Sequence, residues 1–394
     1  MVRVCMVAFT HYSTDSRVRR EAEALVDRGD QVDMIGLRKD GEEKACKLNG
    51  VRVYQISIGR YRGSNTFSYL ISYLFFFIAA AIRLILLHAK NSYQVIQVHT
   101  MPDFMVFVAL LPRILGAKVL LDVHDLMPEL YCSKFKREEA DWLIRFITWL
   151  ERCSIRFAHA AIAVHQPHLD ALIHHGNPGN KFIILLNLPD PKIFSREYIK
   201  CNEDHRGFEL IYHGMLAERN GLGIAIQAVA KLQKEIPDLQ LNIIGEGDAL
   251  PNLLKMIESK SLQAWVKIHP GLIPLDELVP IIAKADVGIV PILYDDFTKY
   301  MLPVKLLEYD ALGIPVICSR TETIRAYFDD SMVAYFTPGD VDGLANCVRD
   351  LYYHPEKRKE LRANADRFNQ EYNWSKQKLV YFDLIDHLAS GKSF

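Results

Sequence analysis

Short apolar runs alternate with helical patterns along nearly the whole chain of 394 residues. Strands are predicted in the first half at 2–8, 31–37, 51–57, 94–98, 117–123, 160–164 and 182–186. After a polar interval, strands are predicted at 208–213, 239–244, 265–269 and 286–290, and helices at 222–234, 250–259 and 275–284. Alternation of this kind predicts parallel sheets with helices on both faces, because each parallel crossover needs a helix. The chain is therefore predicted to form an α/β protein with two doubly wound domains.

The polar interval from Asp190 to Gly207 marks the predicted boundary between the two domains. A chain of 394 residues also exceeds what one hydrophobic core normally holds. We expect an N-terminal domain over 1–190, a C-terminal domain over 191–373, and a last helix over 374–394 that packs back on the first domain.

Charge and cysteine content exclude several function classes. The 47 Lys and Arg residues nearly balance the 48 Asp and Glu residues, so no global field attracts nucleic acid. Seven scattered cysteines without CxxC spacing predict neither a disulfide framework nor a zinc cage. The start of the chain reads as a strand rather than a cleavable signal peptide, so we expect a cytoplasmic protein that is not exported.

The segment 67–87 is almost as long and apolar as a membrane span. Three interpretations stay open: a helix packed inside the domain, a helix docked on a membrane surface, or a true span. A span would interrupt the strand–helix rhythm on either side, which disfavours it. If the segment docks, we expect peripheral attachment to the inner face of the cytoplasmic membrane, with Tyr73, Phe75, Phe76 and Phe77 at the lipid interface.

Candidate ligand residues follow the predicted strands. In open parallel sheets, ligands bind beyond the carboxyl ends of the strands. The residues at these ends are His99, then His124 and Asp125, then Gly214, then Gly245-Glu246-Gly247. These loops predict a ligand site in a cleft between the two domains.

The stretch from Leu302 to Ser319 predicts a short helix opened by Pro303, stopped by Gly313 and followed by a buried strand. Lys305 lies in the first turn and Glu308 three residues later, on the same helix face. The helix N-terminus and Lys305 suit a phosphate, and Glu308 can accept hydrogen bonds from sugar hydroxyls. The pair would hold a nucleoside diphosphate. The alternative is an ordinary exposed ion pair.

A second basic element, Tyr212 to Gly221, lies between a predicted strand and a helix. Gly214 and Gly221 allow tight turns and close approach to a ligand, and Arg219 can make a forked contact with phosphate. Together, Arg219 and Lys305 supply two cations for one diphosphate.

These motifs, together with others along the chain, resemble those of the retaining glycosyltransferases of family four, the glycosyl transferases group one. The five stretches that carry the match are Asp15 to Leu25, His99 to Asp103, Leu121 to Glu129, Gly214 to Gly221, and Leu302 to Val316. The stretch from Ala285 to Pro291 fits the strand that ordinarily precedes the donor helix. The resemblance implies two facing Rossmann-like domains of the GT-B type with an interdomain cleft. It also implies a UDP- or GDP-linked sugar as donor substrate, a glycan or lipid-linked acceptor, and a role in cell-surface polysaccharide or glycoconjugate biosynthesis.

The resemblance assigns roles to single residues. Arg219 and Lys305 correspond to the residues that bind the donor diphosphate, Glu308 to the glutamate that holds the ribose, and His124 to a contact with the transferred sugar. The donor pocket would also include Gly214, Gly245 and Glu246.

The chain departs from the family pattern at several positions. Tyr300 stands where the first glutamate of the paired-glutamate motif is usual, Met215 replaces a basic residue, and Asn220 replaces a lysine. Phe9 to Tyr12 replaces the usual glycine pair of the first loop. The departures concern recognition of the sugar and the acceptor, while Arg219 replaces the missing cation.

The expected chemistry is a metal-independent front-face transfer without a cofactor. No DxD triplet is present, and Asp295-Asp296 lacks the arrangement of a magnesium–diphosphate site. In the retaining reaction that the resemblance implies, the departing phosphate takes the proton of the acceptor. His99, Asp103 and Asp125 are expected on the acceptor side.

Alternatives remain at two levels. His124 can be a purely structural histidine, and Asp122, Asp125 and Glu129 around it make a metal site conceivable, although their spacing lacks a clear ligand pattern. The whole protein can instead be a nucleotide-sugar 2-epimerase of the same architecture, or a non-catalytic two-domain sugar-binding protein.

Overall fold

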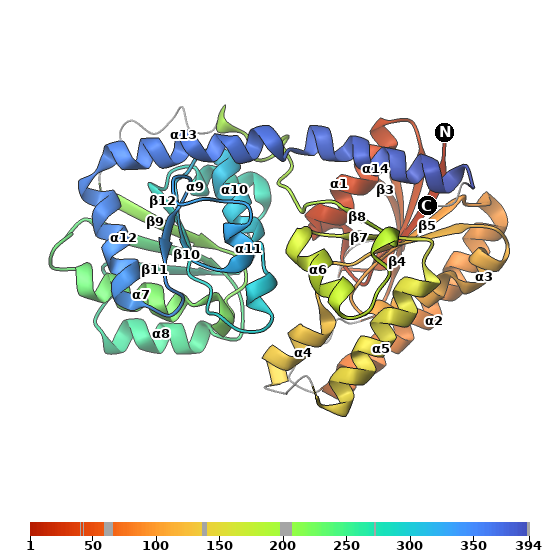
Figure 1. Ribbon diagram of the computed structural model, residues 1–394, viewed down its shortest axis with the longest axis horizontal. Helices are drawn as coiled ribbons and strands as arrows, with labels where there is room; N and C mark the ends of the chain where they lie inside the picture. Colours follow the sequence, from red (N-terminus) through yellow and green to blue (C-terminus); the bar gives the residue numbers. More distant parts are fainter. Residues whose placement is uncertain are drawn as a thin grey trace. The chain divides into compact units, whose positions relative to one another are not determined.

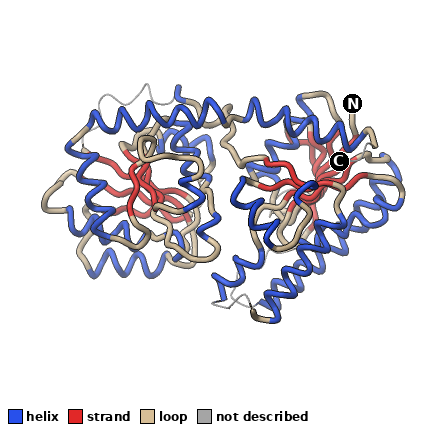
Figure 2. Tube along the Cα trace, viewed as in Figure 1, coloured by secondary structure: helices blue, strands red, loops and turns tan. Residues whose placement is uncertain are grey.

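The computed structural model describes residues 1–39, 41, 43–58, 66–135, 140–197, 207–271 and 273–391, without the side chains of 66–70 and 276. The chain divides into two compact units. Unit 1 comprises Met1–Asn187 and Ser375–Phe394, and unit 2 comprises Leu188–Trp374. In each unit the strands form a central layer with helices around it (Figure 1, Figure 2).

Unit 1 contains an eight-stranded sheet in the order β3-β4-β2-β1-β5-β6-β7-β8. Its strands are β1 (Arg3–Val7), β2 (Gln31–Leu37), β3 (Ala45–Leu48), β4 (Val51–Ile56), β5 (Val95–His99), β6 (Lys118–Asp122), β7 (Ala160–Ala163) and β8 (Phe182–Ile184). All neighbours pair in parallel except β3, which is antiparallel to β4. This edge hairpin was not predicted, because β3 is half-buried at most and lacks an apolar run.

The helices of unit 1 are α1 (Ser16–Asp27), α2 (Thr66–Asn91), α3 (Leu110–Ile114), α4 (Met127–Phe135), α5 (Trp142–Phe157), α6 (Gln166–His174) and α14 (Trp374–Ala389), with the short helices η1 (Tyr12–Thr14), η2 (Asp103–Ala109) and η3 (Gly179–Lys181). Asp15 caps α1, since its Oδ1 accepts a hydrogen bond from the backbone N–H of Val18 at 3.1 Å. From α14, the buried Tyr381 donates its hydroxyl hydrogen to Oε1 of Gln97 on β5 at 2.6 Å.

Unit 2 contains a parallel six-stranded sheet in the order β11-β10-β9-β12-β13-β14. Its strands are β9 (Phe208–His213), β10 (Leu239–Gly245), β11 (Val266–Pro270), β12 (Val287–Val290), β13 (Val316–Ser319) and β14 (Ala334–Phe336). Its helices are α7 (Leu222–Leu232), α8 (Leu250–Ser259), α9 (Leu275–Ile282), α10 (Val304–Leu312), α11 (Glu322–Arg325), α12 (Val341–Tyr353) and α13 (Pro355–Glu371), with η5 (Glu218–Asn220) and η6 (Thr298–Tyr300). The alternation predicted from the sequence is thus present in both units. The cleft predicted between the two domains depends on how the two units are placed relative to each other, and it stays a prediction.

The apolar segment 67–87 forms most of α2. One face packs into unit 1, where Phe76, Ala80 and Leu84 are fully buried. The opposite face is exposed. Within the described residues, Ile71–Asn91 is the one helix long and apolar enough to cross a membrane, with a mean hydropathy of 2.1.

Of the four residues expected at a lipid interface, the structure contradicts Phe76. Phe76 is buried, while Tyr73 and Phe77 are half-buried and contact the rings of Phe9 and Phe104. Phe75 is the exposed member of the set. The sequence shows an apolar helix but not its rotation, because nearly every position on it is apolar.

Candidate functional site

Two glycine-rich loops meet at the carboxyl edge of the sheet of unit 2. The N–H of Gly214 donates to the carbonyl of Ile244 at 2.9 Å, and the N–H of Leu216 donates to the carbonyl of Glu246 at 2.9 Å. Gly245 has a φ of +151°, and a Cβ there would lie 1.9 Å from the carbonyl oxygen of Gly214. Only glycine permits this approach, so the two predicted donor-pocket loops form one surface.

Arg219 projects from η5 at the end of the first of these loops. The backbone holds it in place, because the N–H of Leu293 donates to the carbonyl of Arg219 at 2.8 Å. Its Nη2 lies 3.7 Å from Sδ of Met215. Its Nε is buried and has no hydrogen-bond partner among the described residues. An unsatisfied guanidinium donor of this kind is suited to receiving an oxyanion.

Lys305 lies in the first turn of α10, which Pro303 precedes and Gly313 terminates with a φ of +70°. Its side chain runs over the first loop: a Cβ on Gly214 would lie 3.9 Å from Nζ of Lys305. Nζ also lies 4.9 Å from the ring centre of Tyr212. Burial lowers the pKa of Lys305 to about 8, an effect that Glu308 opposes and Arg219 reinforces. The structure therefore brings the two predicted cations together with Gly214.

Glu308 lies one turn further along α10 and contacts a residue that the sequence analysis did not single out. Its Oε2 is 2.6 Å from Nε2 of His213, the last residue of β9. The Glu308 side chain is only 14% exposed, so the alternative of an ordinary exposed ion pair is wrong. His213 could have been found, because it ends a strand next to Gly214.

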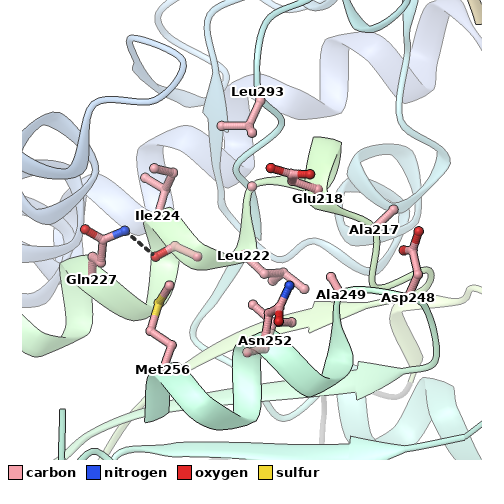
Figure 3. Close-up of a pocket in the computed structure, with 13 residues that line it drawn as sticks. Ala217, Glu218, Leu222, Ile224, Gln227, Asp248, Ala249, Asn252, Met256 and Leu293 are labelled. Atoms are coloured by element: carbon pink, nitrogen blue, oxygen red, sulfur yellow. Dashed lines mark hydrogen bonds between the residues drawn. The ribbon is translucent and has the colours of Figure 1, made fainter. Parts of the chain in front are cut away.

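A cavity of about 430 Å³ borders the first loop on unit 2 (Figure 3). Its lining includes Glu218, Gly221 and Asp248, with apolar side chains such as Met256. Neither Lys305 nor Glu308 lines it. The cavity is therefore separate from the predicted diphosphate-binding residues.

In unit 1 the predicted sugar contact, His124, belongs to a buried cluster around Asp122 at the end of β6. Nε2 of His124 and Nδ1 of His99 each lie 2.9 Å from Oδ2 of Asp122. Arg17 donates to both carboxylate oxygens of Asp122, with its Nη2 2.7 Å from Oδ1 and its Nε 2.8 Å from Oδ2. His124 itself is partly exposed, whereas His99 is 1% exposed. Of the two histidines, only His124 thus presents side-chain surface.

The charges within this cluster determine the protonation of Asp122 and His124. Burial raises the pKa of the Asp122 carboxyl, but Arg17 and His124 outweigh it and hold that pKa well below its usual value. Burial likewise opposes charge on His124, yet the Asp122 carboxylate raises the pKa of His124 above its ordinary value. The carboxylate therefore favours a His124 that carries hydrogen on Nε2.

Asp103 and Asp125, both predicted on the acceptor side, lie after β5 and β6. Asp103 is 4% exposed and its Oδ1 has no hydrogen-bond partner among the described residues. Burial raises the pKa of Asp103 well above its usual value, and Glu151 and Asp125 add to this effect. Asp125 is half-buried. Only Asp125 of this pair presents side-chain surface to an acceptor.

The side chains of His99, Asp122 and His124 are close enough together to hold a metal ion. Asp122, however, already binds the guanidinium of Arg17 through both oxygens. A metal ion would have to displace a buried cation, so this arrangement fits a metal poorly.

Comparisons with known proteins cover both units. A family model described as "Glycosyl transferase 4-like domain" matches residues 14–187, and one described as "Glycosyl transferases group 1" matches residues 207–354. The amylovoran biosynthesis glycosyltransferase AmsK of Erwinia amylovora is 29% identical over 177 residues, or 44% of this chain and 42% of AmsK. The matched region thus spans less than half the length of that relative.

Solved structures match over the whole chain. Sucrose-phosphate synthase from Thermosynechococcus elongatus superposes with a TM-score of 0.79 at 20% identity, covering 100% of both chains. Anabaena Alr3699/HepE in complex with UDP-glucose has a TM-score of 0.73 at 14% identity, covering 98% of this chain and 100% of that one. These matches confirm the predicted fold class, two Rossmann-like domains of the GT-B type, and give no support to the epimerase alternative.

Proposed function

The chain belongs to the group 1 glycosyl transferases, and from this membership we propose that it transfers a sugar from a nucleoside-diphosphate donor to a glycan or lipid-linked acceptor. The single observation that carries the proposal is that Lys305, in the first turn of α10, lies against Gly214 and within electrostatic reach of Arg219. Two cations together with the positive end of a helix dipole provide the charge that a diphosphate needs. We place the reaction in the synthesis of cell-surface polysaccharide or glycoconjugate.

The donor that fits these residues is a UDP- or GDP-linked sugar. Arg219, with its unpartnered Nε, and Lys305 would bind the diphosphate, and Glu308 would accept a hydrogen bond from the ribose. Glu246 and the glycines at 214 and 245 would form the backbone surface of the pocket. That HepE was solved with UDP-glucose supports a uridine donor as the first candidate to try.

We propose a retaining transfer that uses no metal. The bond between the anomeric carbon and the diphosphate oxygen breaks, the acceptor oxygen bonds to the same face of that carbon, and the acceptor proton passes to the departing diphosphate. Arg219 and Lys305 stabilise the negative charge that develops on the leaving group. His124, whose Nε2 lies 2.9 Å from Oδ2 of Asp122, would contact a hydroxyl of the transferred sugar, as the family resemblance implies.

The test is a screen of nucleotide sugars by thermal stabilisation, followed by acceptor-dependent release of nucleoside diphosphate. We expect Lys305→Ala to weaken donor binding about 10- to 100-fold, because a charged hydrogen bond contributes about 1.5–3 kcal/mol. Lys231→Ala, which removes a half-exposed lysine from α7, is the matched control and should bind like the wild type. Unchanged turnover in a folded Lys305→Ala variant would refute the proposal.

For location, we propose that the protein is cytoplasmic and docks on the inner face of the cytoplasmic membrane through unit 1. The outer face of α2 exposes a continuous apolar stripe: Ile71, Leu74, Phe75, Ile78, Ile82 and Leu86. Two neighbouring helices expose further large apolar side chains: Leu110, Leu111 and Ile114 on α3, and Trp142, Phe146 and Trp149 on α5. Large exposed apolar side chains gathered on neighbouring helices are typical of an interaction site.

The helix η2 connects these exposed surfaces. It packs against both α2 and α5, with the ring of Phe104 6.0 Å from that of Phe77 and the ring of Phe107 5.0 Å from that of Phe157. We name the exposed residues of α2, α3 and α5 the apolar face. The proposed docking thus includes 67–87 but extends beyond it.

The occupant that suits this face is an anionic lipid surface. The helices α2, α3 and α5 carry six basic residues: Arg83, Lys90, Arg113, Arg145, Arg152 and Arg156. Their one acidic residue, Glu151, is 1% exposed. Exposed tryptophans beside arginines on an amphipathic helix favour the boundary between headgroups and acyl chains.

A further inference from the structure

We propose that His213 is a positioning residue that holds Glu308 ready for the ribose of the donor, and thereby sets a preference for ribose over 2′-deoxyribose nucleotides. This inference rests on the proposed function. It starts from a contact in which a histidine at a strand end meets a carboxylate on a helix, 95 residues apart in sequence.

The first contact fixes the hydrogen on the imidazole. Nε2 of His213 lies 2.6 Å from Oε2 of Glu308, and both side chains are largely buried, at 9% and 14% exposed. An ionised carboxylate only accepts hydrogen bonds, so Nε2 must donate. Among the described residues, His213 is the one hydrogen-bond partner of Glu308.

The second contact fixes the orientation of the ring. Nδ1 of His213 lies 3.0 Å from the hydroxyl oxygen of Tyr309, and that oxygen accepts a hydrogen bond from the backbone N–H of His213 at 3.2 Å. The Tyr309 hydroxyl lies 3.3 Å from the carbonyl oxygen of Ile211. Contacts at both nitrogens thus hold the imidazole in this orientation.

Tyr309 is itself held by the sheet. It is fully buried, and its ring covers Gly288 on β12 so closely that a Cβ at Gly288 would lie 2.4 Å from it. The support for Glu308 therefore runs from a rigid strand through Tyr309 and His213. A group supported in this way keeps its geometry before the ligand arrives, which reduces the cost of binding.

The two carboxylate oxygens of Glu308 therefore have different partners. Oε2 is occupied by His213, and Oε1 is left to accept a hydroxyl of the ribose. Without His213, the Glu308 carboxylate could turn toward the Lys305 ammonium. Glu308 already interacts with that ammonium, because it partly opposes the lowering of the Lys305 pKa by burial. It would then be lost to the ribose and would neutralise part of the charge meant for the diphosphate.

The experiment compares ribose and deoxyribose nucleotides in the full-length protein. Calorimetric titration with UDP and 2′-deoxy-UDP, and with the GDP pair, gives a ratio of dissociation constants for each variant. We expect the wild type to prefer the ribose form by about tenfold or more, as expected for one hydrogen bond to a charged group. In His213→Leu the ratio should fall close to one, while His213→Gln, whose amide can still donate, should retain most of the preference.

Two further variants make the outcome decisive. Glu308→Gln should lose the preference to a similar extent, and combining it with His213→Leu should cause little further loss. If His213→Leu does not fold, Tyr309→Phe tests the same support, and we expect its ratio to fall several-fold. His354→Leu, at an exposed histidine on the same unit, should leave the ratio unchanged.

The possible failures can be told apart. If the wild type binds UDP or GDP and folded His213→Leu and Tyr309→Phe keep the wild-type ratio, the role of His213 is refuted and the proposed function stands. If His213→Gln loses the preference as fully as His213→Leu, the donor role of Nε2 is refuted. If the wild type binds neither nucleotide, the proposed function and this inference both fail.

Discussion

Two effects act in opposite directions on the charge of Lys305. A diphosphate requires its positive charge, whereas burial against Gly214, together with the charge of Arg219, makes that charge costly and lowers the pKa of Lys305 to about 8. At pH 7 most of the lysine is still protonated. One pH unit above the pKa, only about a tenth remains charged.

This balance predicts a pH dependence of donor binding. Because the folded pKa is lowered, Lys305 loses its proton as the pH rises through about 8, within the range where the diphosphate is already fully ionised. We expect the dissociation constant for UDP or GDP to increase up to about tenfold between pH 7 and pH 9. Isothermal titration at a series of pH values measures this directly.

The control for that prediction is Lys305→Arg. A guanidinium stays protonated throughout this range, so the variant should show little change in affinity between pH 7 and pH 9, whatever its absolute affinity. An equal loss of affinity with pH in the arginine variant would assign the effect to another group.

Residues differ in how readily the sequence reveals them. Lys305 and Arg219 could be predicted, because a lysine at a helix start and an arginine in a glycine-rich loop have a direct chemical meaning. His213 and Asp122 act through other side chains, Glu308 and His124. Their partners are 95 and 2 residues away, and only the fold shows that these side chains meet.

At the scale of elements, three helices of unit 1 are tied together by one charged histidine. His175, following α6, lies 2.9 Å from Oε1 of Glu129 on α4 and 3.0 Å from Oε1 of Glu151 on α5. Burial opposes charge on the ring, but the two carboxylates prevail and raise the pKa of His175 to about 10. The charged imidazole therefore stabilises the folded state.

The sign of the resulting pH effect follows from the raised pKa. Its stabilisation is fully present below the ordinary histidine pKa of about 6.5 and is lost as the pH rises through about 10. We expect His175→Gln to lower the free energy of unfolding by about 2–4 kcal/mol at pH 6, and the difference from the wild type to shrink toward pH 10.

Urea unfolding of the wild type and His175→Gln at pH 6, 8 and 10 measures that difference. Because other groups titrate in both proteins, only the gap between the two curves is informative. A gap that is constant across this range would mean that the ring acts by packing or neutral hydrogen bonds rather than by charge.

The sequence predicts elements best where their apolar runs are long. The central strands, such as β1, β5 and β9, agree with their predicted positions within about a residue or two because buried parallel strands are apolar on both faces. The edge strands β3 and β14 are short and only partly buried, and they were not predicted. The rotation of α2 could not be predicted either, since an almost uniformly apolar helix has no polar side to orient it.

At the scale of the whole molecule, charge is balanced overall but uneven on the surface. The chain has a net charge of −1, yet the exposed side chains on α2, α3 and α5 include basic residues and no acidic ones within the described residues. Long-range attraction of the whole protein to an anionic surface is therefore weak. Attraction must come from the apolar face and the arginines beside it, acting within about one Debye length.

The apolar face and the arginines beside it predict that the protein binds vesicles. Binding should depend on the charge of the lipids and on the exposed side chains of α5. We expect the protein to sediment with vesicles containing phosphatidylglycerol and much less with pure phosphatidylcholine, with binding weakened by high salt. Reversing two exposed charges, Arg145→Glu with Arg156→Glu, should weaken binding at least tenfold, since each basic residue near the surface contributes about 1 kcal/mol. Trp149→Ser should weaken it through lost apolar contact.

A matched pair of reversals on unit 2, Lys231→Glu with Lys359→Glu, should bind vesicles like the wild type, because neither lysine belongs to the helices that carry the apolar face. Equal binding by all variants would contradict docking through α5, and recovery of the wild type entirely in the supernatant would contradict docking itself. If sedimentation equilibrium instead shows dimers that Trp149→Ser dissociates, the apolar face binds a second copy of the chain. Lipid binding and self-association would then compete for the same side chains, and that outcome would overturn the membrane proposal while leaving the donor site unaffected.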